Sequence, residues 1–182
     1  RSQPQPSVGN DEVETIDLGE VITSAIREGS SADVEAIYSP DVIGVFEGVE
    51  LAPEIARPIL TDVSMRDLVR ATTSECGEWR ENGTVTCRFH HEFAFLDDIT
   101  ELHSGSVTFT LVDGVVTRYE QLHDDFDATI DALAGYRSWV LAVHPDTGAT
   151  LFNRAGMSNG GPVAATLHAE YAAEYNATLA LL

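Results

Sequence analysis

Two segments of the chain place titratable side chains among aromatic residues. In the first, His91 stands between Phe89 and Phe93 at alternate positions. Alternate residues of a β-strand point to the same face of its sheet, so this spacing puts an imidazole on an apolar face. A neutral imidazole in that setting can exchange a proton near neutral pH. His91 is therefore a candidate acid–base residue, and its alternative role is a core histidine bonded to backbone.

The second segment runs from Tyr119 to His123. Only one face of such a strand can look into a protein interior. If Glu120 faces inward, its carboxylate lies among apolar walls, where a raised pKa suits it to remove a proton beside a carbonyl. In the opposite orientation Tyr119 and His123 take its place. The alternative for Glu120 is a solvated strand residue beside Arg118.

Other catalytic patterns are missing from the sequence. Four histidines, His90, His91, His103 and His123, have carboxylates nearby, but adjacent strand residues point apart and no HExxH spacing occurs. There is also no GK[ST] phosphate loop and no G-x-S-x-G elbow. We therefore expect no metal site and no cofactor.

The balance of charge restricts the partners of the protein. The 182 residues include 30 acidic and 10 basic side chains, which give a formal net charge of -20. Such a charge repels phosphate backbones and anionic lipid headgroups. No run of apolar residues is long enough to span a bilayer. We expect a small apolar molecule as partner, with no nucleic acid and no membrane insertion.

The only two cysteines, Cys76 and Cys87, flank a turn signal, Glu81-Asn82-Gly83-Thr84. If Arg80 to Gly83 form a four-residue loop, the two cysteines face each other across a hairpin. Directly opposed strand residues are close enough for a disulfide. The alternative is a pair of reduced thiols. A disulfide would favour an exported protein, since such bonds persist in oxidising compartments.

Periodicity predicts helices, then a meander of strands, then helices. Asp113-Gly114 is the sharpest hairpin signal, because a type I′ turn needs positive φ at both positions. Ser31 is expected to cap the second helix. The expected helices are 13–28, 31–38, 53–60, 126–143 and 163–182, and the expected strands are 41–46, 65–79, 84–95, 101–112 and 115–123.

Two stretches carry a resemblance to a known family. They are DVEAIYSPDVIGVFEG, at residues 33–48, and LVDGVVTRYEQLHDDFD, at residues 111–127. The chain resembles the NTF2-like superfamily, in particular its SnoaL-like branch of small bacterial proteins. The resemblance implies an α+β cone, in which a curved antiparallel sheet wraps around N-terminal helices, with an additional C-terminal helical extension. It divides the chain into a flexible leader (1–12), the NTF2-like domain (13–126) and the extension (127–182), packed on the domain or on a dimer partner.

The resemblance also implies functions. It implies a SnoaL-like pocket for a small molecule and an acid–base isomerase, cyclase or lyase step. The alternative is a non-catalytic binding or dimerisation module, which could lie outside the cytoplasm. Whether the protein is an enzyme is left open. A homodimer is expected, and the bacterial protein is either cytoplasmic or exported. The expected catalytic residues are His91, Glu120 and His123, and the expected ligand-binding residues are Tyr119, Phe89, Phe93 and Phe109.

Overall fold

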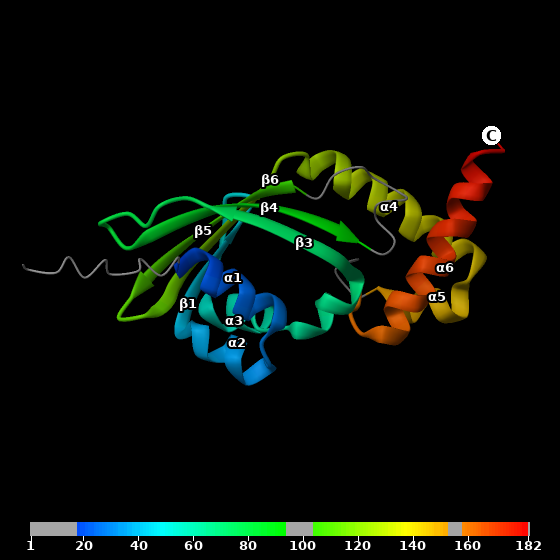
Figure 1. Cartoon of the computed structure of the whole chain (residues 1–182). Coiled ribbons are helices and arrows are strands. Elements are labelled where there is room, and N and C mark those ends of the chain that lie inside the picture. Colours follow the sequence, from blue (N-terminus) through cyan, green and yellow to red (C-terminus); the bar gives the residue numbers. More distant parts are fainter. Residues whose placement is uncertain (1–17, 94–103, 153–157, 182) are drawn as a thin grey trace, which may run out of the picture.

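A computed structural model of the chain describes residues 18–93, 104–152 and 158–181. Within these ranges the structure has helices before and after a run of strands (Figure 1). The helices are α1 (Leu18–Glu28), α2 (Ser31–Ile37), α3 (Pro53–Leu60), the 3-10 helix η1 (Val63–Leu68), α4 (Phe126–Val143), α5 (Pro145–Leu151) and α6 (Pro162–Leu179). The strands are β1 (Tyr38–Phe46), β2 (Val49–Leu51), β3 (Val69–Cys76), β4 (Thr84–Phe93), β5 (Ser104–Val112) and β6 (Val115–His123).

The six strands form one curved sheet in the order β2-β1-β6-β5-β4-β3. The four strands β3 to β6 follow one another as the predicted antiparallel meander. Strand β1 runs parallel to β6, so the sheet is mixed rather than wholly antiparallel. Helices α1, α2 and α3 lie on the concave side, while α5 and α6 lie beyond one end of the sheet (Figure 1). This is the predicted α+β cone with its C-terminal helices.

The β5–β6 hairpin turns at the predicted dipeptide. Asp113 and Gly114 have φ of 51° and 83°, as a type I′ turn requires. One feature of this hairpin was not predicted. Leu111 is opposite Val116 and Thr110 is opposite Arg118, so Thr117 is an extra residue in β6. Such a β-bulge reverses the inward and outward alternation of every residue that follows it.

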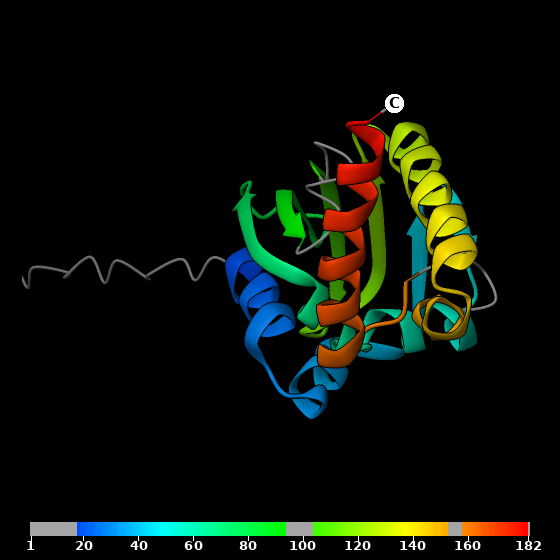
Figure 2. The same ribbon diagram turned by 90° about the vertical axis from the view of Figure 1, so that its right-hand side faces the viewer.

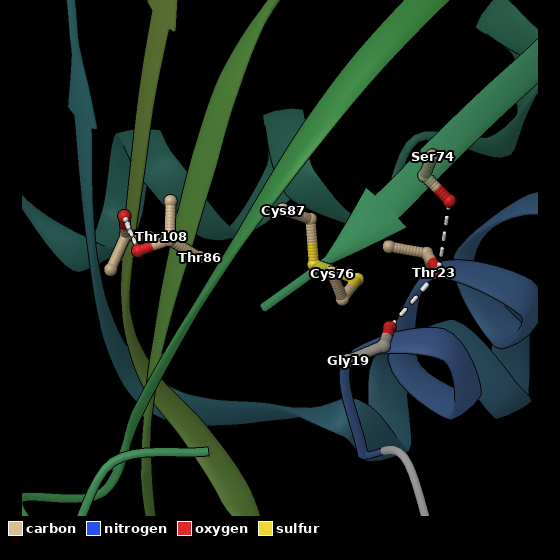
Figure 3. Close-up of a disulfide and its surroundings, with 7 residues drawn as sticks. All are labelled: Gly19, Thr23, Ser74, Cys76, Thr86, Cys87 and Thr108. Carbon is tan, nitrogen blue, oxygen red and sulfur yellow. Dashed lines mark hydrogen bonds between the residues drawn. A yellow bond between two sulfur atoms is a disulfide. The ribbon is translucent and has the colours of Figure 1, made fainter. Parts of the chain in front are cut away.

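The disulfide between Cys76 and Cys87 is formed, and the two residues are directly opposed (Figure 3). The predicted four-residue loop is wrong, because Arg80 pairs with Thr84. That pairing closes a three-residue loop. The cysteines still face each other because the chain between Gly77 and Arg80 bulges by one residue: Gly77 donates its N–H to the carbonyl of Thr86. By the chain-entropy model, a short loop closed in this way stabilises the fold by roughly 3 kcal/mol.

Helix α1 packs directly on the disulfide. A methyl group on Gly19 would come within 2.7 Å of Cys76 Cβ and 3.1 Å of a Val85 methyl carbon, so only glycine fits there. One turn on, the Thr23 hydroxyl donates to the Gly19 carbonyl. The Ser74 hydroxyl of β3 lies 3.5 Å from the Thr23 hydroxyl (Figure 3). The disulfide hairpin therefore fixes α1 over the concave face of the sheet.

Several predicted boundaries differ from the structure, two of them for clear local reasons. The cap of α2 is Ser30, not Ser31, because Ser30 and Asp33 form a capping box with reciprocal hydrogen bonds. The strand expected from Met65 begins only at Val69, since the preceding residues form η1. Between the two expected C-terminal helices the structure has a further short helix, α5. The expected strand ends beyond Phe93 lie outside the described residues.

The C-terminal helices have a hydrophobic core of their own, which also includes Leu68 of η1. Through this contact they pack on the rest of the same chain. Figure 2 shows α6 in the middle of the end that faces the viewer, with α4 to its right. His168 of α6 is fully buried there, and its Nδ1 lies 3.2 Å from the Tyr136 hydroxyl. Burial lowers the pKa of His168 to about 4.

No helix within the described ranges is long and apolar enough to cross a membrane.

We predict that His168 makes the protein sensitive to mild acid. The unfolded chain binds a proton below an ordinary histidine pKa near 6.5, whereas the folded chain does so only near pH 4. Stability is therefore full above about pH 6.5 and falls by up to about 3 kcal/mol as the pH drops to 4. Urea unfolding across this range should show that loss in the wild type and a smaller loss in His168→Phe. An equal loss of unfolding free energy between pH 6.5 and pH 4 in the two proteins would contradict the assignment.

Candidate functional site

A cavity of about 380 Å³ lies between the concave face of the sheet and the helices that cover it. The helices contribute apolar side chains such as Ile26, Val34 and Leu60, and the sheet contributes others such as Phe89 and Phe109. Apolar groups thus line both sides. The predicted ligand-binding residues Tyr119, Phe89 and Phe109 all line this cavity. The side chain of Phe93 lies outside the described residues, so its role stays a prediction.

The polar groups of β6 form one hydrogen-bonded chain that leads out of the cavity. The Tyr119 hydroxyl donates to Gln121 Oε1 at 2.6 Å, and Gln121 Nε2 lies 3.0 Å from His123 Nε2. His123 Nδ1 in turn lies 2.7 Å from Glu47 Oε1. Tyr119 and Gln121 line the cavity, while Glu47 and His123 stand behind them. We call these four residues the Tyr119–Glu47 chain.

Glu47 reaches His123 because of the tight turn between β1 and β2. Glu47 and Gly48 both have positive φ, 50° and 78°, and the Glu47 N–H donates to the carbonyl of Gln121. Its Oε1 also accepts the backbone N–H of His123 at 2.9 Å. The sequence shows Glu47-Gly48 as a turn signal, but these residues are 76 positions from His123. The parallel pairing of β1 with β6 brings them together, and no local pattern reports it.

The Tyr119 ring is held by aromatic contacts on several sides. Phe46 and Phe109 lie 5.6 Å away between ring centroids, and Tyr38 lies 6.4 Å away. These rings come from both neighbouring strands, so the phenol has little freedom to turn. Burial raises the pKa of the Tyr119 phenol well above its ordinary value. The hydroxyl therefore stays protonated at physiological pH.

His91 lies on the same wall as the Tyr119–Glu47 chain. It lines the cavity and stacks on Phe89 with ring centroids 4.7 Å apart, which confirms that these two residues share a face. The His123 ring makes a T-shaped contact with the same Phe89 ring, with centroids 5.6 Å apart. Gly105 allows this contact, because a methyl group there would come within 2.7 Å of the ring. Phe89 thus separates the two histidines.

Glu120 does not face the cavity, so of the two orientations left open for this strand the inward one for Glu120 is not observed. Its carboxylate lies 2.6 Å from Arg118 Nε, and the same arginine lies 3.0 Å from Glu50. Buried Val116 and simple alternation would turn Glu120 inward, but the bulge at Thr117 reverses the face. The orientation left open for Tyr119 and His123 is the one observed.

The convex face of the sheet is polar. Thr86 and Thr108 share a hydrogen bond of 2.9 Å there. Arg88 binds both carboxylate oxygens of Asp124, at 3.0 and 2.6 Å, and the hydrogen bonds to Arg88 lower the pKa of that carboxyl. The described part of the chain holds no group of three or more His, Cys, Asp or Glu residues arranged to bind a metal ion.

Two arginines stand at the helix-lined end of the cavity, together with Asp62. Arg27 pairs with Glu28. Arg66 donates from Nη1 to the Gly29 carbonyl, while its buried Nη2 has no hydrogen-bond partner among the described residues. Arg66 was not singled out from the sequence, because it lies in η1, where a strand was expected. This end therefore brings two guanidinium groups to the cavity, with the carboxylates of Glu28 and Asp62 beside them.

Comparison with known proteins identifies the fold. No family model matches the chain, and no curated protein matches its sequence. Among solved structures, a protein from Kribbella flavida is 10% identical with a TM-score of 0.53, and the match covers 67% of this chain and 95% of that one. At such low identity the likeness establishes a shared fold and leaves activity and substrate open.

Two further similar structures carry family names. An NTF2-like protein of unknown function from Burkholderia xenovorans is 10% identical, with a TM-score of 0.44 over 59% of this chain and 80% of that one. A proposed SnoaL-like polyketide cyclase from Mesorhizobium loti is 14% identical, with a TM-score of 0.43 over 58% and 95%. The curved mixed sheet of this chain, with helices on its concave side, is the α+β cone that the resemblance to NTF2-like proteins predicts.

Proposed function

We propose that this NTF2-like protein binds a small, largely apolar molecule in the cavity between its helices and its sheet. The cavity itself carries the proposal: it measures about 380 Å³ and is lined mainly by apolar side chains. Small-molecule sites are concave and mostly apolar, with a few polar groups that fix the orientation of the ligand. Here those groups are His91 and Tyr119 on the sheet and Arg66 on the helical side. A bicyclic molecule with one or two oxygen atoms suits this arrangement.

We further propose that the bound molecule undergoes an acid–base step of the isomerase, cyclase or lyase type. His91 is the group that would exchange the proton, because its imidazole lines the cavity and is positioned by the Phe89 ring. Tyr119 would orient the ligand, since it lines the cavity and its ring is held by Phe46 and Phe109. His123 acts behind Tyr119 and does not line the cavity. Glu120 takes no part, because it lies on the other face.

The binding proposal predicts that filling the cavity abolishes binding. Val107 lines the cavity and is 6% exposed, so Val107→Phe places an added ring inside it. The affinity for 2-methoxynaphthalene, measured by fluorescence titration, should fall at least about tenfold, a loss of roughly 1.4 kcal/mol. Thr108→Val is the matched control, because Thr108 is the next residue along β5 and faces the convex side. Circular dichroism checks that both variants fold. Equal affinities, or no saturable binding by the wild type, would refute the proposal.

The acid–base proposal predicts general-base activity that depends on His91. A suitable reporter is 5-nitrobenzisoxazole, a bicyclic molecule whose ring opens when a base removes its C–H proton. The wild type should accelerate this reaction, because a neutral imidazole in the cavity can accept the proton. His91→Ala should lose at least about tenfold of the rate while it still binds 2-methoxynaphthalene. A rate unchanged by this substitution would make His91 a wall residue only.

The alternative function is a non-catalytic binding or dimerisation module outside the cytoplasm, and the disulfide is the observation that favours it. We keep the homodimer as part of either function. Static light scattering should then report about twice the chain mass of 19.7 kDa. Pairing through the convex face would use polar groups such as Arg88 and Asp124, so high salt should weaken it. A single-chain mass at high protein concentration would contradict the dimer.

A further inference from the structure

The Tyr119–Glu47 chain has a direction, and the carboxylate end fixes it. A carboxylate offers only acceptors, and Glu47 Oε1 already accepts the backbone N–H of His123. His123 Nδ1, at 2.7 Å from the same oxygen, must therefore carry a proton. In a neutral imidazole the other nitrogen then has a lone pair and no proton. His123 Nε2 is thus an acceptor that faces Gln121.

The side-chain amide of Gln121 passes this direction on. Its Nε2 can only donate, and it lies 3.0 Å from the acceptor Nε2 of His123. The amide oxygen must then point the other way, where it accepts the Tyr119 hydroxyl at 2.6 Å. Turning the amide over would bring its oxygen against the lone pair of the imidazole. The neutral histidine therefore selects one of the two amide orientations.

The Tyr119 hydroxyl is the inner end of the chain. Its single proton is committed to Gln121, so the phenolic oxygen offers the cavity only its remaining lone pairs. The ring contacts with Phe46 and Phe109 keep the oxygen in place. A ligand group that needs a donor, such as a carbonyl or an ether, gains nothing from this oxygen. A hydroxyl or an N–H gains a hydrogen bond.

We propose that the Tyr119–Glu47 chain makes Tyr119 a hydrogen-bond acceptor, so that the cavity selects ligands that carry a hydroxyl or N–H donor on an apolar body. This proposal rests on the proposed function and names the class of ligand for the same cavity. Glu47, His123 and Gln121 are positioning residues, since they act through Tyr119 and need not touch the ligand.

The first test needs no ligand. Long-range proton–nitrogen NMR of protein labelled with ¹⁵N in histidine reports which imidazole nitrogen carries the proton. At pH 8 the His123 signal, identified by its loss in His123→Asn, should be that of a neutral ring protonated at Nδ1. Glu47→Ala should change this tautomer, whereas Glu47→Gln should keep it, because the amide oxygen still accepts. Glu50→Ala is the control: that carboxylate belongs to the same hairpin but pairs with Arg118. Protonation of His123 at Nε2 in the wild type would overturn the proposal.

The second test uses two probes that differ in one donor. Naphthalen-2-ol has a hydroxyl, and 2-methoxynaphthalene replaces its proton with a methyl group. The wild type should prefer the naphthol by about threefold to tenfold, the range of one hydrogen bond. Gln121→Leu frees the Tyr119 proton, so the preference should shrink toward one. Thr108→Val, on the convex face, should keep the wild-type preference.

The outcomes separate this proposal from the proposed function. A preference that Gln121→Leu leaves unchanged overturns the role of the chain, although the cavity still binds. Absence of saturable binding by either probe overturns the proposed function, and the histidine tautomer then still decides the direction of the chain. Loss of the preference in Gln121→Leu, together with the Nδ1 tautomer in the wild type, supports both.

Discussion

One extra residue in β6 decides which side chains reach the cavity. The β5–β6 hairpin leaves its turn with Val116 directed into the core. Thr117 then has no partner on β5, and the faces of the strand exchange beyond it. Tyr119 consequently lines the cavity, and Glu120 joins the ion pairs of the convex face. The cavity wall on β6, the Tyr119–Glu47 chain and the polar outer surface all depend on this bulge.

Sequence reasoning succeeds where a short motif fixes the backbone. Asp113-Gly114 sets a type I′ turn, and the helix 126–143 has the predicted ends. The cysteine pairing was predicted from a turn of the wrong length, and a compensating bulge preserved it. The face of β6 could not be predicted, because nothing in the residues around Thr117 marks a bulge. The contact of Glu47 with His123 was equally hidden, since it arises from parallel pairing between distant strands.

The cavity lies between the sheet and the helices, and both sides are held in place by contacts elsewhere in the fold. The disulfide hairpin and Gly19 fix α1 against the sheet, and the C-terminal helices pack on η1 through Leu68. Both supports act on the elements that close the cavity. The side chains that can exchange protons or form hydrogen bonds with a ligand, by contrast, lie on the concave wall of the sheet, where regular strands fix their spacing. A site on strands that is covered by anchored helices can keep a fixed hydrogen-bond direction.

The orientation of β6 is the claim on which this account depends, and proton NOE contacts in solution test it directly. The account predicts contacts between the Tyr119 and Phe109 rings, whose centroids are 5.6 Å apart. It also predicts contacts between Glu120 and the methyl group of Thr108, its partner on β5. Contacts of Glu120 with the Phe109 ring, and none between Tyr119 and that ring, would show that the strand faces the other way and would contradict the account.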